Sequence, residues 1–225
     1  MNKIPSLFKR DWNDKDHQIV NVIDPKCAWV LDGEGIPTRK WDGTAVLMKD
    51  GKMYKRYDRK KITKGPEKGQ WKPELAGWIS CEVDDVAGHW WGWIPVDFSD
   101  PSNKWYKDAV LGIIEGNDPP VADAAVELDA IRLPIENGTY ELCGPAVNGN
   151  PERLEKHVLI PHGKEILDFQ FEHKDDAWDE LEHYLSDHDI EGIVWWHGKD
   201  DRKAKIKAID FKVGRAASNP GGTAD

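Results

Sequence analysis

The amino-acid sequence predicts an α+β domain built mainly from antiparallel β-sheets. Residues 44–48 form an apolar strand candidate, Asp50-Gly51 is a hairpin turn, and residues 52–57 supply the returning strand. Residues 175–187 form the clearest helix, because acidic residues begin it and apolar residues recur three and four positions apart. That apolar face comprises Trp178, Leu181 and Leu185.

The other segments add strands to this fold. Residues 137–142 and 190–196 each consist of a turn followed by a strand. Residues 203–213 alternate, which predicts a further strand with a basic and an apolar side. The basic side is Lys203, Lys205 and Lys207, and the apolar side is Ala204, Ile206, Ala208 and Phe211. Residues 63–105 are rich in Pro, Gly and Trp without a helical period, so we expect a strand and long loops there.

Length and composition indicate one soluble domain. We expect an N-terminal segment over residues 1–34 that packs on a domain spanning residues 35–213, followed by a disordered tail over 214–225. The chain is 39% hydrophobic and 32% charged and has no apolar run near the ~20 residues of a membrane span. It also begins without the apolar stretch of a signal peptide, so we expect a cytoplasmic protein. We also expect a monomer. The three cysteines are widely spaced, which favours reduced, mostly buried thiols.

Charge is distributed unevenly along the chain. The net charge is −10, yet residues 49–72 carry ten basic and three acidic side chains, giving +7. Residues 199–215 carry seven basic and three acidic side chains, giving +4, so the remainder is at −21. Such runs are commonly solvated faces. Because both lie near candidate catalytic lysines, they also favour a surface that binds phosphate.

A lysine beside an Asp-Gly turn, followed far downstream by two glutamates and a lysine pair, is the most informative pattern. These residues are Lys40, Asp42, Gly43, Glu141, Glu191, Lys205 and Lys207. A lysine near an Asp-Gly turn is commonplace by itself. In this order, however, an enzyme has a lysine to attack ATP, carboxylates to hold a metal and cations to neutralise phosphate. The sequence therefore predicts a covalent nucleotidyltransferase.

Four segments resemble motifs I, III, IV and V of the covalent nucleotidyltransferases, which comprise DNA ligases, RNA ligases and mRNA capping enzymes. The segments are Lys40-Trp41-Asp42-Gly43, residues 140–145, residues 191–194 and residues 203–207. More specifically, the chain resembles the compact ATP-dependent 5′-to-3′ RNA ligases of phages and animals over roughly residues 35–212. That likeness rests on residues 138–142 running into 144–152, on residues 54–58 and on residues 88–93.

The resemblance implies a ligase adenylation domain of antiparallel sheets flanked by helices, without an OB-fold domain. It implies that Lys40 forms a lysyl-AMP intermediate with ATP, helped by Mg²⁺ or Mn²⁺. AMP would pass to an RNA 5′-phosphate, and a 3′-hydroxyl would then expel AMP and seal the strand. The expected partner is RNA with a 5′-phosphate and a 3′-hydroxyl end.

Residue roles follow from the same resemblance. The expected catalytic residues are Lys40, Lys205 and Lys207, and the expected metal ligands are Glu191 and Glu141. The expected nucleotide contacts are Arg39, Lys40, Asp42, Gly43, Arg56, Glu141, Lys205 and Lys207. Glu141 is assigned to the ribose or a metal-bound water, Asp42 to orienting the lysine or the ribose, and Arg56 to nucleic-acid phosphate or the nucleotide. A lysine attacks phosphorus only as the neutral amine, which neighbouring cations and desolvation favour.

Other classes remain open on the sequence. A DNA ligase or a capping enzyme shares the lysine chemistry, although both usually carry an OB-fold domain and a dozen residues follow Val213. A non-catalytic RNA-binding module on a ligase scaffold is a further alternative. Trp90, Trp91 and Trp93 either stack on RNA bases or adenine, or pack in the core.

Overall fold

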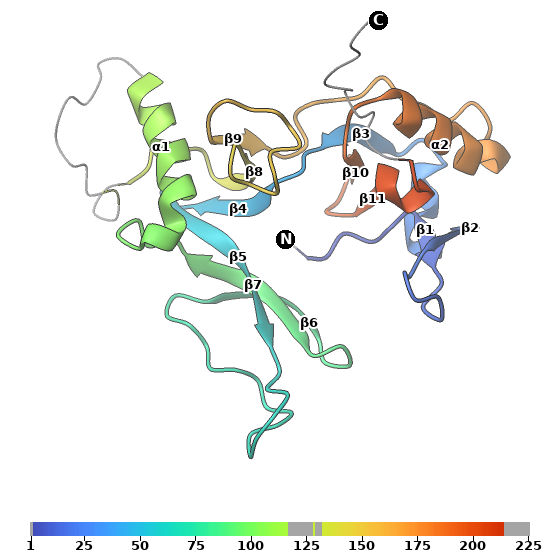
Figure 1. Ribbon diagram of the computed structural model, residues 1–225. Coiled ribbons are helices and arrows are strands. Elements are labelled where there is room, and N and C mark those ends of the chain that lie inside the picture. The colour runs from blue at the N-terminus through green and yellow to red at the C-terminus, as the bar shows by residue number, and fades with distance from the viewer. Residues whose placement is uncertain (1, 117–127, 129–131, 214–225) are drawn as a thin grey trace, which may run out of the picture. The chain divides into compact units, whose positions relative to one another are not determined.

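The protein folds into two compact units (Figure 1). A computed structural model describes residues 2–116, 128 and 132–213. Unit 1 contains Asp42–His162 and the first three residues, and unit 2 contains Ile4–Trp41 and the residues from Gly163 onward. Each unit has its own cluster of buried apolar side chains.

Unit 1 is built on a six-stranded antiparallel sheet in the order β6-β7-β5-β4-β8-β9. Its strands are β4 (Thr44–Lys49), β5 (Lys52–Lys60), β6 (Ile79–Asp84), β7 (His89–Pro95), β8 (Gly138–Cys143) and β9 (Val158–Pro161). The 3-10 turn η2 (Pro101–Asn103) leads into helix α1 (Lys104–Gly116). Helix α1 places Ala109 and Val110 in a core with Val46 and Met48 of β4, which closes one face of the sheet.

The predicted hairpin is confirmed in β4 and β5. Met48 lies opposite Met53 and Lys49 opposite Lys52, so Asp50 and Gly51 form a two-residue turn. Both turn residues have positive φ, 53° at Asp50 and 75° at Gly51. A type I′ hairpin requires this conformation, and Asp-Gly provides it at low steric cost.

Unit 2 is built on the three-stranded antiparallel sheet β11-β10-β3. Its strands are β1 (Phe8–Arg10), β2 (Ile19–Ile23), β3 (Gly35–Lys40), β10 (Gly192–His197) and β11 (Lys203–Lys207), with β1 and β2 paired to each other. Its helices are α2 (Ala177–Asp187) and the 3-10 turns η1 (Pro25–Val30), η4 (Lys174–Asp176) and η5 (Ala208–Phe211). Ile193 and Ile206 of the sheet share a core with Leu181 and Leu185 of α2, as the apolar face of the predicted helix requires.

Three sequence expectations need correction. The strand expected over residues 203–213 ends at Lys207, and Phe211 reaches the core from η5. The region 63–105 contains two strands, β6 and β7, where one was expected. Helix α1 was not predicted, although Asp100 caps the turn before it by accepting a hydrogen bond from the Ser102 amide.

Other expectations have different outcomes. The tail expected at residues 214–225 lies outside the described residues. In the segment expected over residues 1–34, residues 4–34 form β1, β2 and η1 and contribute to the core of unit 2. None of the three cysteines forms a disulfide, Cys27 and Cys143 are buried, and burial raises the pKa of the Cys27 thiol to about 12. No helix among residues 2–116 and 132–213 combines the length and apolar character that crossing a membrane requires.

Candidate functional site

The central strand β10 brings the candidate lysines of β3 and β11 together. Gly192 at the start of β10 lies opposite Lys40 on one side and Lys207 on the other. A Cβ atom at Gly192 would collide with the Ile206 carbonyl oxygen and the Lys207 Cα. The strands approach this closely because residue 192 has no side chain.

Sheet register places the lysines on one face. Residues directly opposite in antiparallel strands point to the same side, and side chains alternate along each strand. Lys40 and Lys207 therefore share a face, and Lys205, opposite Val194, joins them. The other face carries Ile193 and Ile206, both 0% exposed in the core. Because the apolar residues that alternate with the lysines are buried in the core, the lysines must point to the opposite side of the sheet.

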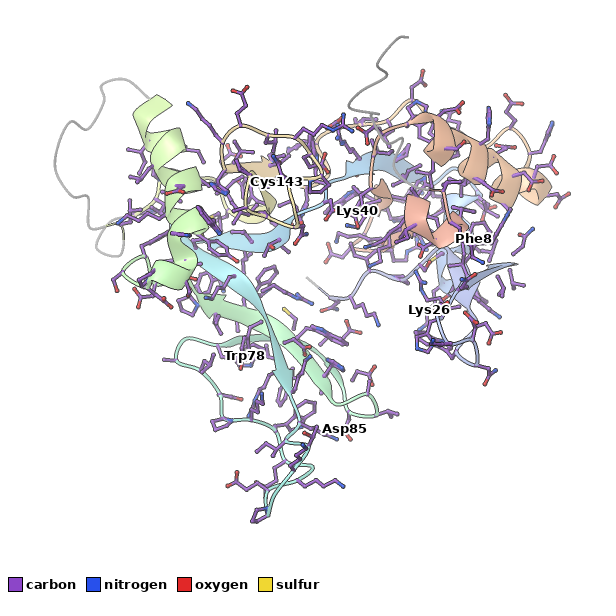
Figure 2. All side chains as sticks on the ribbon, in the orientation of Figure 1. Phe8, Lys26, Lys40, Trp78, Asp85 and Cys143 are labelled. Atoms are coloured by element: carbon purple, nitrogen blue, oxygen red, sulfur yellow. The ribbon has the colours of Figure 1, made fainter. Side chains whose placement is uncertain are left out.

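Glu191 sits at the centre of this lysine cluster, defined as Lys40, Lys205 and Lys207 around the Glu191 carboxylate (Figure 2 labels Lys40). Lys40 Nζ donates to Glu191 Oε2, and Lys207 Nζ lies 2.6 Å from Oε1. The Glu191 side chain is only 12% exposed. Three cations facing one carboxylate leave an excess of positive charge, which suits an anionic ligand such as phosphate.

Lys205 has a strongly perturbed titration. Burial, followed by the charges of Lys40 and Lys207, lowers the pKa of Lys205 to about 8, against an opposing effect of Glu191. Arg10 adds to the lowering. Desolvation and like charges both disfavour a cation, and the opposite charge of a bound phosphate would favour it again.

The Asp42-Gly43 turn belongs to unit 1, where the loop after β8 holds it. Asn148 Nδ2 donates to Asp42 Oδ1 and to the Gly43 carbonyl oxygen, both at 2.9 Å. The Asp42 amide donates to Glu152 Oε1 at 2.9 Å. A Cβ at Gly43 would collide with the Leu142 carbonyl oxygen, so only glycine fits against β8. Asn148 and Glu152 therefore position the turn that follows the candidate nucleophile.

Glu141 is nearly buried and has a histidine partner. It lies on β8 opposite Ala45 and Ile160 and is 9% exposed. His162 Nε2 lies 2.7 Å from Glu141 Oε2. The Glu141 charge adds to burial in raising the pKa of Tyr106 to about 12. A carboxylate held in this way has a fixed orientation, which a hydrogen-bond acceptor for a ribose hydroxyl needs.

The remaining predicted contacts are spread over both units. Arg56 on β5 lies opposite Trp93, with its guanidinium carbon 5.1 Å from the ring centre, and Trp93 is 1% exposed. Trp93 is therefore a packed residue, whereas Trp90 and Trp91 are partly exposed. Arg39 lies on the opposite face of β3 from Lys40, with its guanidinium 3.9 Å from the Trp41 ring centre. The structure thus groups Lys40, Glu191, Lys205 and Lys207 but not Arg39.

Sequence reasoning missed several residues that shape these groups. Asn148 and Glu152 lie in the segment that carries the family resemblance, so attention to its polar side chains could have found them. Arg10 Nη2 lies 2.7 Å from Asp210 Oδ1, and Asp210 Oδ2 accepts from the Lys207 amide at 3.1 Å. Nothing in the local sequence around Arg10 signals this contact, because its partner is 200 positions away.

A divalent cation has a restricted set of donors here. Within the described residues, no group of three or more His, Cys, Asp or Glu side chains is arranged to hold a metal ion. Mg²⁺ usually retains waters and takes one or two carboxylates plus substrate phosphates. Both oxygens of Glu191 already pair with lysines, Oε2 with Lys40 and Oε1 with Lys207, so a divalent ion would have to share this carboxylate with them.

The lysine cluster of unit 2 defines a class of site. A largely buried carboxylate ringed by lysines on one sheet face is suited to bind phosphate and to present an amine. Comparison with known proteins narrows the class.

No known protein-family profile matches the chain, but individual proteins do. RNA ligase 1 of Pongo abelii is 26% identical over 260 residues, covering 91% of this chain and 78% of that protein. RNA ligase 1 of Danio rerio is 34% identical over 92 residues, which cover 28% of that protein. RNA ligase 1 of Mus musculus is 31% identical over 131 residues, which cover 38% of it. At modest identity, these relatives support an RNA ligase family for the chain.

Proposed function

We propose that the protein is an ATP-dependent RNA ligase of the nucleotidyltransferase superfamily, and that Lys40 carries AMP as a covalent intermediate. The observation that supports this most directly is the grouping of Lys40, Lys205 and Lys207 around Glu191 on one sheet face. The relatives named RNA ligase 1 support the choice of RNA as substrate.

The first step is adenylation. The neutral amine of Lys40 forms a bond to the α-phosphorus of ATP, the bond from that phosphorus to the β-phosphate oxygen breaks, and pyrophosphate leaves with its electron pair. One proton is lost from Nζ to solvent. Lys205 and Lys207 bind the α-phosphate oxygens, so negative charge developing there meets fixed cations. A divalent ion bound at Glu191 would supply further charge neutralisation at phosphate.

The next two steps transfer AMP and seal the strand. An oxygen of the RNA 5′-phosphate attacks the α-phosphorus, the phosphorus–nitrogen bond breaks with its electron pair on nitrogen, and the nitrogen takes a proton from solvent, which restores the Lys40 amine. The 3′-hydroxyl then loses its proton and attacks the 5′-phosphorus, and AMP leaves. Glu141 contacts the ribose or a metal-bound water, Asp42 orients the lysine or the ribose, and Arg56 contacts phosphate or nucleotide. Gly43 completes the proposed nucleotide contacts, whereas Arg39, which points to the opposite face of β3 from Lys40, is left out of them.

Labelling with ATP carrying a radioactive α-phosphate tests the proposal. With Mg²⁺ or Mn²⁺ the wild-type protein should form an adenylated band that Lys40→Ala lacks, and Glu191→Ala should reduce it. Lys40→Ala should still seal a pre-adenylated RNA strand, which shows that the rest of the site is intact. RNA binding without any adenylated band would instead identify a non-catalytic binding module.

Substrate choice is tested separately. Nicked RNA and nicked DNA of the same sequence, each with a 5′-phosphate and a 3′-hydroxyl, should be compared for sealing by the wild-type protein. Preferential sealing of RNA supports the proposal. Preferential sealing of DNA would indicate a DNA ligase.

A further inference from the structure

An aromatic and basic surface lies on unit 1, on β5, β7 and the segment that joins β5 to β6. The Arg59 guanidinium carbon lies 4.8 Å from the centre of the Trp90 ring, and Lys61 Nζ lies 5.2 Å from that of Trp71. The two indole rings meet edge to face with centroids 5.4 Å apart. We call Arg59, Lys61, Trp71 and Trp90 the Trp71–Trp90 surface.

Packing holds these rings in place. Trp90 Nε1 donates to Ser80 Oγ at 2.8 Å, and Lys61 forms an isolated antiparallel bridge with Trp71. Both rings nevertheless remain partly exposed. An aromatic ring held by its edge and still accessible is a surface on which a nucleic-acid base can stack.

The charge around the rings favours a polyanion. Residues 59–72 contain six basic side chains and one acidic one, giving +5 in a chain of net charge −10. Arg59 pairs with Glu74 at 2.9 Å, Lys60 with Asp58 at 3.6 Å and Lys61 with Asp85 at 2.8 Å, so these three cations are already used within the unit.

Three lysines remain for an external phosphate. Lys64, Lys68 and Lys72 are exposed, and within the described residues none of them forms an ion pair. Lys64 and Lys68 lie in the loop that the Lys61–Trp71 bridge closes, and Lys72 directly follows Trp71. Cations for phosphates and rings for bases on one segment match the chemistry of a polynucleotide strand.

We propose that the Trp71–Trp90 surface binds single-stranded RNA, with Trp71 and Trp90 stacking on bases and Lys64, Lys68 and Lys72 contacting phosphates. The choice of RNA rests on the proposed ligase function. A single strand is favoured over a duplex because stacking on a side chain needs an unstacked base. The surface holds the substrate and contains none of the residues assigned to adenylation.

Salt-dependent binding tests the lysines. A fluorescently labelled single-stranded RNA should be titrated, without ATP, with wild-type protein and with Lys64→Gln/Lys68→Gln/Lys72→Gln. For single strands each lost phosphate contact reduces the slope of log affinity against log salt by about 0.7, so the triple variant should lower it by about 2. The charge-matched control is Lys9→Gln/Lys15→Gln/Lys26→Gln, three exposed lysines of unit 2, which should leave the slope unchanged. An unchanged slope in the first variant, or an equal change in both, overturns the proposal.

Ring substitutions test stacking. Trp71→Ala should weaken single-strand binding at least about fivefold, and Trp71→Phe, which keeps a ring, should restore most of it. Equal wild-type affinity for a duplex of the same length contradicts a stacking surface. Formation of lysyl-AMP distinguishes the ligase proposal from the RNA-binding proposal. If the triple lysine variant loses RNA binding but is still adenylated, both proposals are supported. If the wild-type protein is adenylated but these substitutions leave its RNA affinity unchanged, the Trp71–Trp90 surface does not bind RNA and the ligase proposal stands.

Discussion

At the scale of single residues, Lys205 combines a cost in stability with the phosphate-binding role proposed for it. It is partly buried beside two other lysines, and these surroundings lower its pKa to about 8. Between that pH and the ordinary value of 10.5, the unfolded chain binds a proton at Lys205 that the folded protein has lost. The cost of the buried cation is therefore present below pH 8 and is relieved as the pH rises through this window.

Replacing Lys205 should therefore stabilise the protein. Lys205→Met should raise the free energy of unfolding at pH 7 by at most about 3.5 kcal/mol, because the pKa falls from 10.5 to about 8 and each pKa unit corresponds to about 1.4 kcal/mol, and solvent screening of this partly exposed group lowers the gain. It should also flatten the rise in stability between pH 8 and 10.5. Urea denaturation across this pH range measures both effects. The same substitution should reduce lysyl-AMP formation, because it removes a cation proposed to bind the α-phosphate. A loss of stability at pH 7 would show that attraction to Glu191 outweighs the burial cost.

The Asn148 side chain should matter for the Asp42-Gly43 turn. Asn148 has φ of 49°, so Asn148→Gly keeps the backbone conformation available while removing both donated hydrogen bonds. We expect a loss of about 1–3 kcal/mol in stability, at about 0.5–1.5 kcal/mol for each bond, and slower adenylation of Lys40. Thermal unfolding and single-turnover labelling check the two effects. Unchanged adenylation would mean that Asp42 needs no support from this loop.

At the scale of elements, strand β10 organises the lysine cluster. Its first residue, Gly192, is opposite lysines on both neighbouring strands, while Ile193 and Trp195 point into the core. Because one face of β10 is fixed in the core, the lysines of β3 and β11 are held at defined positions on the other face.

Gly192→Ala should disturb this arrangement. The added methyl would collide with the Ile206 carbonyl oxygen, so β10 and β11 must separate. We expect a loss of about 1–3 kcal/mol in stability and a larger proportional loss of lysyl-AMP formation. Gly198→Ala is the matched control, because a Cβ there meets nothing within 4 Å. Similar effects of the two substitutions would contradict the role given to Gly192.

At the scale of the whole molecule, the Lys-x-Asp-Gly motif straddles two units. The chain leaves unit 2 after Trp41 and returns to it after His162, so Lys40 and Asp42 belong to different units. Each unit has its own buried cluster, with Val46 in one and Leu185 in the other.

Core substitutions should act on one unit at a time. Leu185→Ala and Val46→Ala each remove a side chain that is 0% exposed, and we expect a loss of about 2–5 kcal/mol for the leucine and less for the smaller valine. Hydrogen exchange should show reduced protection in β10 and β11 for Leu185→Ala, and in β4 and β8 for Val46→Ala. Equal loss of protection throughout the chain in both variants would identify a single cooperative unit.

Local pattern explains which predictions succeeded. The Asp50-Gly51 hairpin and the apolar face of α2 depend on neighbours in sequence, and both are confirmed. The extent of β11 was wrong because alternation continues to Ala208 while the backbone turns into η5. Helix α1 was missed because it begins only at the end of the Pro-, Gly- and Trp-rich region, and no element was predicted over the residues that follow that region.

The sequence by itself determined the residue types of the candidate site, their order, the hairpin and the antiparallel α+β class. Only the tertiary structure decided that Lys40 and Lys207 both reach Glu191, that Arg39 points to the other face of β3, and that Arg10 contributes charge near Lys205. The physical reason is that periodicity is a property of neighbouring residues. Strand register and burial instead join residues about 150 positions apart, and they alone set which charges meet.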